Sequence, residues 1–420
     1  MGRKAGLLMA ALAVLAAVGC GATEPVVPSV TETVPEQDCS GLVTAISGAV
    51  SDYVAVYALD PSAQAEASGE QAGQRLQQTL QNTYQQLSSA QCDQRAFLAD
   101  LKADLAAVPA DGVIAQAVLS RLSANITGEI STAKTIRVTP KADLHQVVAQ
   151  AAPGAVLELQ KGSYALSQPL VLLDGVVLRG EGAKRTVISS TAPDAALLVL
   201  AGDVVTLEQL SIIRDAGVPG SGVIASAASL LRLSAVNISG ARAAADTSGG
   251  AGVDMSSSET LENVGTTLEI TDSTFSSNSY AGVSVGGTHQ VSIVGSSFSK
   301  NSQCGICFLG AASGSVEKSK FNSNGIGIAA VGDSDPLLTA TTFTAGDVGI
   351  QIGDRSRATV DAVTISKAKK AAIIVAGTAT PIIRKAKCSQ VAYGIVLSSE
   401  ALPSLIDNTC TVAKAASKEK

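Results

Sequence analysis

The sequence contains no tryptophan, and aromatic residues make up only 3% of its 420 positions. Charged residues are scarce as well, at 16%, and the formal net charge is −6. This balance excludes a nucleic-acid-binding protein that works through a basic surface. The hydrophobic fraction of 46% excludes a mainly disordered chain. A large core without aromatic side chains needs small, regular layers of Val, Ile, Leu and Ala, which favours a repetitive architecture.

The N-terminus has the pattern of an export signal. Arg3 and Lys4 precede an apolar run, Leu7 to Val18, that is too short to span a bilayer. The tetrapeptide Ala17-Val18-Gly19-Cys20 resembles a bacterial lipobox, which implies cleavage before Cys20 and lipidation of that residue. The alternative is an ordinary secretory signal that ends near a chance cysteine.

The resemblance to a lipobox predicts a location in the bacterial cell envelope. We expect residues 1–20 to be the signal peptide and the proline-containing residues 21–38 to be a linker between lipid and fold. Gly21 rather than Asp follows Cys20, and by the sorting pattern of such lipoproteins this implies the outer membrane in an organism that has one, with the protein on its periplasmic or surface face. The lipid makes the membrane the first expected partner.

Residues 39–133 show apolar positions at helical spacing, which predicts a small bundle of three or four helices. Cys39 precedes the first predicted helix and Cys92 lies between later ones, so we expect these two cysteines to pair. The predicted apolar stripes are Leu42, Ile46, Val50, Val54 and Tyr57; Leu76, Leu80, Tyr84 and Leu87; Phe97, Leu98, Leu101 and Leu105; and Val118, Leu122 and Ile126.

From about residue 135 the pattern changes to short strands that repeat every 22 or 23 residues. Such a period is typical of one coil of a solenoid in which like side chains stack. The leucine-rich repeat has the same period, but its consensus pattern is missing. We predict a right-handed parallel β-helix of about ten coils over residues 135–412, followed by a tail at 413–420. One stacked column contains Ile212, Ile238, Phe275, Phe298, Phe321, Phe343, Ile365, Cys388 and Cys410.

Two further columns support this register. The first starts a strand and contains Val223, Val253, Val283, Ile306, Ile328, Ile350, Ile373 and Ile395; each follows a glycine except Ile373, which follows Ala372. The second contains Asn278, Asn301 and Asn324, each three residues after a phenylalanine. Asparagine at a stacked turn bonds backbone groups and tolerates left-handed conformations.

The start of the repeat region resembles that of the pectin-lyase-like β-helix superfamily. The segment Asp143 to Tyr164 reads as a short capping helix followed by a Pro-Gly … Gly-x-Tyr strand, and Gly175-Val-Val-Leu-Arg-Gly-Glu-Gly182 as the next strand. The resemblance implies a right-handed parallel β-helix for this region. Together with the bundle predicted over residues 39–133, the expected fold is mainly β, a right-handed parallel β-helix solenoid with an N-terminal α-helical bundle. The resemblance says little about activity, because the superfamily contains lyases, hydrolases, adhesins, NosD-like accessory proteins and non-enzymes.

The solenoid register predicts the remaining cysteine pairs. Cys388 and Cys410 occupy the same site in successive coils, within disulfide range of each other. Cys304-Gly-Ile-Cys307 has the spacing of a redox motif but not a thioredoxin-like context, so a local structural disulfide is expected there.

The outward positions bear on catalysis. Sugar-cleaving β-helices place paired carboxylates, or calcium-binding acids with a basic group, on an outward strand face. The outward column that follows the inward Val and Ile residues contains one acid, Asp254, and the Asn-Thr-Asp, Asp-Asp and Gly-His-Gly motifs of polygalacturonases are absent. His145 and His289 have no ligand partner at useful spacing, so no metal and no cofactor are expected.

One irregular coil stands out. The connections 238–253 and 253–270 are longer than those of later coils and flank the strand with Asp254. Loops that interrupt a strict repeat often carry binding sites, although tolerated surface insertions look the same. The candidate ligand rim contains Asp254, Arg242, Asp246, Glu259 and Glu262.

The sequence therefore favours a non-catalytic binding or structural module of the cell envelope, with a polysaccharide or an envelope protein as partner and no nucleic acid. The alternatives are a polysaccharide lyase or glycoside hydrolase of the pectin-lyase-like superfamily, and a NosD-like periplasmic accessory protein. No residue is assigned as catalytic, because an enzyme needs titratable groups that converge in a groove.

Overall fold

The computed structural model describes residues 39–59, 64–89, 92–173, 175–199, 204–215, 217–225, 229–245, 248–255 and 265–414. The predicted signal peptide, Cys20 and the predicted linker lie outside these residues. The chain divides into two compact units: residues 1–132 with 145–152, and residues 133–144 with 153–420. None of the described helices combines the length and hydropathy that a membrane-spanning segment requires.

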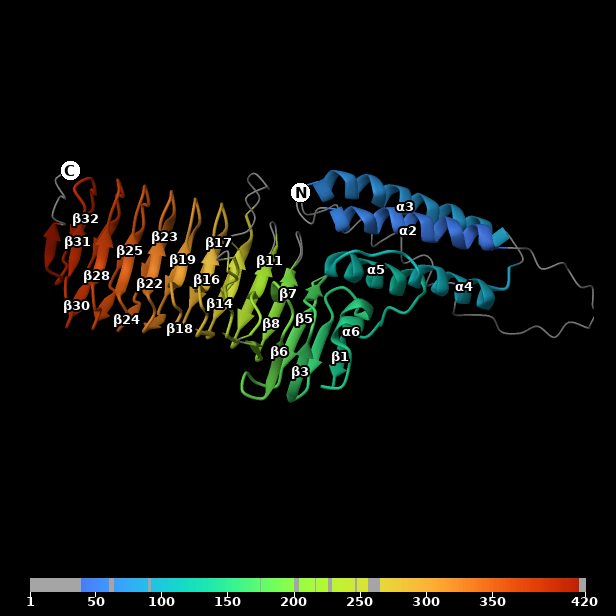
Figure 1. Ribbon diagram of the computed structural model, residues 1–420, viewed down its shortest axis with the longest axis horizontal. Helices are drawn as coiled ribbons and strands as arrows, with labels where there is room; N and C mark the ends of the chain where they lie inside the picture. Colours follow the sequence, from blue (N-terminus) through green and yellow to red (C-terminus); the bar gives the residue numbers. More distant parts are fainter. Residues whose placement is uncertain are drawn as a thin grey trace, which may run out of the picture. The chain divides into compact units, whose positions relative to one another are not determined.

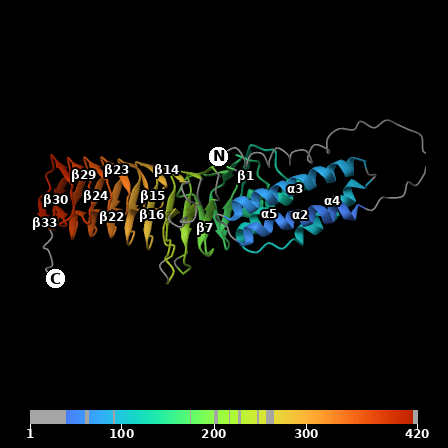
Figure 2. The same cartoon turned by 90° about the horizontal axis from the view of Figure 1, so that it is seen from above.

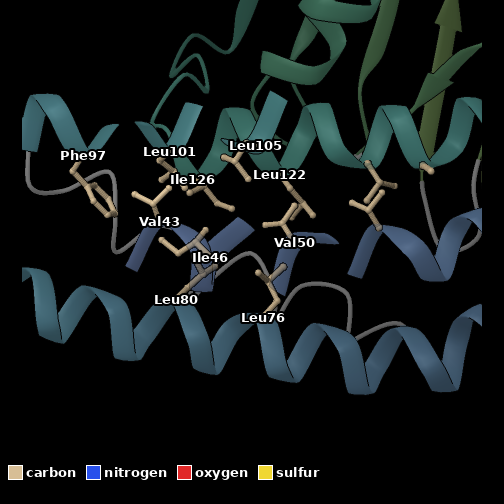
Figure 3. Packing of buried hydrophobic residues seen from close by; sticks show 13 residues of the cluster. Val43, Ile46, Val50, Leu76, Leu80, Phe97, Leu101, Leu105, Leu122 and Ile126 are labelled. Carbon is tan, nitrogen blue, oxygen red and sulfur yellow. The ribbon is translucent and has the colours of Figure 1, made fainter. Parts of the chain in front are cut away.

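The first unit is helical, as the sequence predicts. It contains α2 (Ser40–Leu59), α3 (Gln64–Ser89), α4 (Gln94–Ala106), α5 (Val113–Ile126) and most of α6 (Leu144–Gln150). Ile46, Val50 and Leu76 are fully buried between these helices, together with Leu101 and Leu105 (Figure 3). A disulfide joins Cys39 to Cys92, with a Cα–Cα distance of 6.3 Å.

Two side chains of the bundle, Leu98 and Arg121, add detail to the predicted packing. The sequence predicts Leu98 on the apolar stripe of α4, but this residue is 39% exposed, because Phe97, Leu101 and Leu105 alone form the buried face of the helix. The buried Arg121 donates from Nη1 to the backbone oxygens of Ala149 and Ala151. This contact explains why residues 145–152 belong to the helical unit.

The second unit is a parallel β-solenoid with three sheets, which confirms the predicted fold (Figure 1). Every strand pair between successive coils is parallel, and the strands follow each other in chain order along each sheet (Figure 2). Sheet A consists of β1 (Thr135–Val138), β2 (Val156–Leu159), β5 (Val177–Gly180), β8 (Val204–Glu208), β11 (Leu230–Ser234), β14 (Thr267–Thr271), β17 (Gln290–Val294), β20 (Ser313–Glu317), β23 (Asp335–Thr339), β26 (Thr359–Asp361), β29 (Ile382–Arg384) and β32 (Ser404–Ile406).

The other two sheets complete each coil. Sheet B consists of β3 (Gly162–Leu166), β6 (Thr186–Ser190), β9 (Ser211–Arg214), β12 (Asn237–Ser239), β15 (Thr274–Ser276), β18 (Ser297–Ser299), β21 (Lys320–Asn322), β24 (Thr342–Thr344), β27 (Thr364–Ser366) and β30 (Lys387–Ser389). Sheet C consists of β4 (Leu170–Leu172), β7 (Ala195–Val199), β10 (Ser221–Ala225), β13 (Val253–Met255), β16 (Ala281–Val285), β19 (Cys304–Phe308), β22 (Ile326–Ala330), β25 (Val348–Ile352), β28 (Ala371–Val375), β31 (Ile395–Leu397) and β33 (Val412–Lys414).

The phenylalanine column lies inside the solenoid in the predicted register. Phe275 pairs with Phe298, Phe298 with Phe321, and Phe321 with Phe343. Their rings stack with centroids 5.1, 4.8 and 4.8 Å apart. Because one ring fills each coil, the backbone of sheet C passes close to it, and a Cβ on Gly305 would lie 2.5 Å from a ring carbon of Phe321. The glycines of this column therefore make room for the stack.

The last coils are closed by a disulfide between Cys388 and Cys410, whose Cα atoms are 4.9 Å apart. Cys304 pairs with Cys307 inside β19. The strand β33 pairs with β31 as far as Lys414, so regular pairing continues past residue 412, where the sequence predicts a tail.

Candidate functional site

The predicted ligand rim is described only in part. Asp254 pairs with Ile224 on one side and with Ser284 on the other, in the outward column that the sequence predicts. It is nevertheless covered, with 8% of its surface exposed, and the hydroxyl of Ser221 donates to its Oδ2 at 3.4 Å. Arg242 forms an antiparallel bridge with Gly220, so the long connection folds back against the start of β10.

The other members of the rim, Asp246, Glu259 and Glu262, lie outside the described residues, and their grouping stays a prediction. Within the described residues, no group of three or more His, Cys, Asp or Glu side chains is arranged to hold a metal ion. The residues that the structure brings together here are therefore Asp254, Ser221 and the backbone of the folded-back connection.

The structure adds Tyr280 to this region, a residue that sequence reasoning missed. Burial raises the pKa of its phenol, the Asp254 carboxylate raises it further, and the nearby Ser284 hydroxyl acts in the opposite direction. The Oγ of Ser284 is fully buried and has no regular hydrogen bond in the described part of the chain. A phenol with a raised pKa stays protonated at neutral pH, so it serves as a hydrogen-bond donor rather than as a base.

Neighbouring side chains in sheet C form an apolar cover rather than an open groove. Cys304 and Cys307, 5% and 2% exposed, cluster with Ala251, Ala281 and Ala329. Tyr280, Leu309 and Ile326 pack against this cluster. The disulfide is consequently a buried structural link, consistent with the expectation from its context.

His289 also has a structural position. Its side chain is 3% exposed, and its Nδ1 accepts a hydrogen bond from the backbone N–H of Thr266 at 2.8 Å. Burial lowers its pKa, so the imidazole is neutral at pH 7.

The outward face of sheet A is dominated by ion pairs between coils. Arg179 pairs with Glu208 at 2.6 Å, and Arg232 with Glu269 at 2.7 Å. Each exposed ion pair of this kind contributes little to the stability of the fold. The pairs nevertheless neutralise the arginine and glutamate side chains on this face. Sheet A therefore offers a self-neutralised surface along its first coils.

The outward face of sheet B has a different chemistry. In each strand from β12 to β30 the central residue points inward and the two flanking residues point outward. Every outward position is Ser, Thr, Asn or Lys, and none is acidic or apolar. We call this surface the hydroxyl face; its residues are Asn237, Ser239, Thr274, Ser276, Ser297, Ser299, Lys320, Asn322, Thr342, Thr344, Thr364, Ser366, Lys387 and Ser389.

The hydroxyl face is accessible and regular. All its side chains are exposed or partly exposed, and its strands β18, β24 and β30 lie along one side of the solenoid (Figure 1). Apart from a bond from Ser323 to Asn322, the described residues provide no side-chain hydrogen bond to this face. Because parallel strands are about 4.8 Å apart, its hydroxyl groups recur at that interval along the solenoid.

Positive charge accompanies the hydroxyl groups. Lys320 and Lys387 belong to the face, and Lys300 and Lys367 follow β18 and β27 in the turns with positive φ. In the described part of the chain none of these four lysines forms an ion pair with a carboxylate. The face therefore combines repeated hydroxyl groups with unneutralised cations, although the whole chain is acidic.

A pattern in the sequence could have revealed this face. The residues on either side of the inward column are hydroxylated in Thr274-Phe-Ser276, Ser297-Phe-Ser299 and Thr342-Phe-Thr344. The signal lies in the residues that flank the phenylalanines, outside the outward column of sheet C that contains Asp254.

Comparisons with known proteins agree with the fold. Residues 281–416 match the family model described as a right-handed β-helix region. No curated protein matches the chain. Similar solved structures include ORF18 of Geobacillus virus E2, with 12% identity over 63% of this chain and 55% of that chain and a TM-score of 0.48. The chain thus spans little more than half the length of the viral protein.

Enzymes are also among the similar structures. DFA-IIIase from Arthrobacter chlorophenolicus A6 shares 10% identity over 60% of this chain and 84% of that chain, with a TM-score of 0.43. A polygalacturonase from Erwinia carotovora shares 12% identity over 68% of this chain and 97% of that chain, with a TM-score of 0.39. At such identities the likeness concerns the fold alone.

Proposed function

We propose that this protein is a non-catalytic binding module that holds an extended acidic polysaccharide along the hydroxyl face of sheet B. We further propose that a lipid on Cys20 anchors it to the bacterial envelope. The observation that carries the binding proposal is the composition of the hydroxyl face, where hydroxyl, amide and ammonium groups repeat without a single acid.

The chemistry of the hydroxyl face suits a polymer of sugars. Each Ser or Thr hydroxyl both donates and accepts hydrogen bonds, as does each sugar hydroxyl. A repeating polymer that lies along the solenoid meets equivalent groups at every coil, at intervals of about 4.8 Å. Many weak contacts then add up along one rigid surface, and the strands need no rearrangement to make them.

The four lysines at the hydroxyl face favour acidic polysaccharides over neutral ones. Lys300, Lys320, Lys367 and Lys387 have no carboxylate partner among the described residues, so carboxylate or phosphate groups of a bound polymer would neutralise them. Exposed charges are screened by salt, with a Debye length of about 10 Å at 0.1 M ionic strength. Binding should therefore weaken as ionic strength rises.

The test is affinity electrophoresis of the purified full chain, in mild detergent, through gels that contain polygalacturonate or neutral dextran. We expect retardation by polygalacturonate that decreases with added salt, and much weaker retardation by dextran. Replacement of Thr342, Thr344 and Thr364 by Val should reduce the affinity for polygalacturonate more than tenfold. The matched control replaces Thr339 and Thr359 by Val, because these partly exposed threonines lie in sheet A of the same coils.

A charge variant separates the two components of the proposal. Lys320→Gln with Lys387→Gln should weaken binding and flatten its dependence on salt, while the hydroxyl groups stay in place. Equal retardation of the wild-type chain and the valine variant would disprove a role of the hydroxyl face. Release of new reducing ends or unsaturated products from the polymer would instead establish the enzymatic alternative.

The anchoring proposal is tested separately. We expect the wild-type chain expressed in bacteria to fractionate with membranes and to carry a mass increase on an N-terminal Cys20. The Cys20→Ser variant should keep an uncleaved signal and lack that mass increase. A wild-type chain that is cleaved at another residue and carries no lipid would contradict the anchor without affecting the binding proposal.

A further inference from the structure

Among the described residues, the last strand of sheet A has a partner on one side only. The strand β32 is the last of the twelve strands in this sheet and pairs with β29 on one side only (Figure 1). Its central residue, Leu405, continues the inward column of sheet A after Leu338, Val360 and Ile383. Those three residues are fully buried, whereas Leu405 is 36% exposed.

Other apolar side chains are exposed in the last coil. Ile406 is 45% exposed, and Val412 of the end strand β33 is 52% exposed. The disulfide between Cys388 and Cys410 links the last coil to the one before it, close in sequence to β32. Natural solenoid ends and edge strands usually carry charges or a cover. Among the three residues of β32 none is charged.

The direction of the backbone hydrogen bonds shows which N–H and C=O groups of β32 point toward its open edge. Ser404 donates its N–H to Pro381, and Ile406 accepts from the N–H of Lys385, so both residues point their backbone groups toward the preceding coil. Because these groups alternate along a strand, the N–H and C=O of Leu405 both point toward the open edge. A residue with this arrangement forms a doubly hydrogen-bonded pair with a like residue on an antiparallel strand.

We propose that two copies of this chain associate end to end through an antiparallel pair of β32 strands centred on Leu405. A two-fold axis at this residue lets each Leu405 donate to, and accept from, the same residue of the other copy. The two inward leucine side chains then close both cores against each other. A two-fold interface of this kind uses one surface twice, as most homodimers do.

The charges of the last coil are compatible with this arrangement. Between Ser404 and Lys414 the only charged residues are Asp407 and Lys414, which have opposite signs. In the proposed pair the Asp407 residues of the two copies are four residue steps apart along the strands, about 13 Å at 3.3 Å per residue. That separation exceeds the Debye length of about 10 Å at 0.1 M ionic strength, so their repulsion is small.

The test is sedimentation velocity of the purified full chain in mild detergent between about 1 and 100 μM. We expect a concentration-dependent dimer for the wild type and a monomer for Ile406→Asp. The matched control is Ile382→Asp, because Ile382 is also outward in sheet A and 41% exposed, but lies one coil inside the edge. The control should remain dimeric, and thermal unfolding should confirm that both variants are folded.

A second variant tests the backbone pair directly. Leu405→Pro removes the N–H that points to the open edge and keeps the bonds that Ser404 and Ile406 make to the preceding coil. It should also be monomeric. A wild-type monomer throughout the concentration range would overturn the proposal. So would a chain shortened after Lys414 that dimerises while the full chain does not, because residues 415–420 would then occupy the edge.

Discussion

Asn278 and Asn301 form a hydrogen bond between their side chains inside the turn from sheet B to sheet C, with Nδ2 of Asn278 3.0 Å from Oδ1 of Asn301. Asn301 makes the same bond to Asn324 at 3.0 Å. Oδ1 of Asn301 and Oδ1 of Asn324 also accept the backbone N–H of the preceding asparagine, and Nδ2 of Asn301 donates to the backbone oxygen of Phe275. The ladder satisfies buried polar groups that no water can reach, as all three side chains are at most 3% exposed.

We predict that Asn301→Ala strongly destabilises the solenoid. The substitution removes the acceptor for Asn278 and the donor for Phe275, leaving buried polar groups without partners. Each such group costs about 1–3 kcal/mol, so the free energy of unfolding should fall by several kcal/mol. Urea unfolding followed by circular dichroism measures the change.

The control for this prediction is Asn322→Ala. Asn322 is exposed, and among the described residues its side chain bonds only with the neighbouring Ser323 hydroxyl. Exposed substitutions of this kind usually change stability by less than about 0.5 kcal/mol. Equal losses in the two variants would contradict the role assigned to the buried ladder.

The glycines beside the phenylalanine stack lead to a second prediction. A Cβ at Gly305 would lie 2.5 Å from Phe321 and 2.6 Å from the backbone oxygen of Gly327. Gly305→Ala should therefore cost about 1–3 kcal/mol through overpacking, although alanine suits a strand better than glycine. The midpoint of thermal unfolding should fall accordingly.

A second substitution distinguishes overpacking from other causes. Ala372 precedes Ile373 in sheet C as Gly305 precedes Ile306. At Ala372 the stacked column of sheet B that contains Phe321 continues with Cys388 instead of a phenylalanine. The smaller side chain leaves space for a Cβ. Phe321→Leu should thus be less destabilising in the Gly305→Ala background than in the wild type; additive losses would exclude a clash with the ring and leave the contact with the Gly327 backbone oxygen as the cause.

The disulfide of the last coils provides a third prediction. Cys388 and Cys410 close a loop with a sequence separation of 22 residues, whereas Cys304 and Cys307 are separated by 3. Loop-closure entropy assigns about 3 kcal/mol to the longer loop and about 2 kcal/mol or less to the shorter one. Replacement of both cysteines of a pair by Ala should consequently lower the unfolding midpoint more for the first pair than for the second. The reverse order would contradict the entropic account.

Much of the fold was predictable because each coil repeats the same environment. Phe275, Phe298, Phe321 and Phe343 stand at one point of successive coils, so a fixed interval in the sequence reveals the stacked register. The cysteine pair Cys388–Cys410 follows from the same register. Inward positions are strongly constrained by packing, and their pattern is correspondingly easy to read.

The candidate sites were less predictable because they depend on what lies over a sheet. Asp254 was expected on an outward face and does occupy that column, but Tyr280 and the folded-back connection at Arg242 lie in the same region and its side chain is buried. The residues that cover Asp254 include those of an irregular connection. Because this connection does not repeat from coil to coil, the period of the sequence does not predict where it folds. The hydroxyl face was visible in the sequence, in the residues on either side of Phe275 and its equivalents, and needed only the direction of the side chains to be recognised.

The last prediction concerns pH. His289 is buried, its Nδ1 accepts the N–H of Thr266, and burial lowers its pKa below the ordinary value of about 6.5. As the pH falls below about 6.5, the unfolded chain takes up a proton at this residue and the folded chain does not. The unfolded state then binds more protons, so the contribution of His289 to stability is present above that pH and decreases progressively as the pH falls toward the lowered folded pKa.

His289→Asn isolates this contribution, because the amide oxygen of asparagine accepts the same backbone N–H and does not titrate in this range. We expect the free energy of unfolding to fall more steeply for the wild type than for the variant between pH 7.5 and 5.5, measured by urea unfolding at several pH values. Carboxylates that titrate at lower pH affect both proteins alike, so the difference between the two curves reports on His289. Parallel curves would show that the imidazole takes up its proton equally in the folded and unfolded states, contrary to its burial against Thr266.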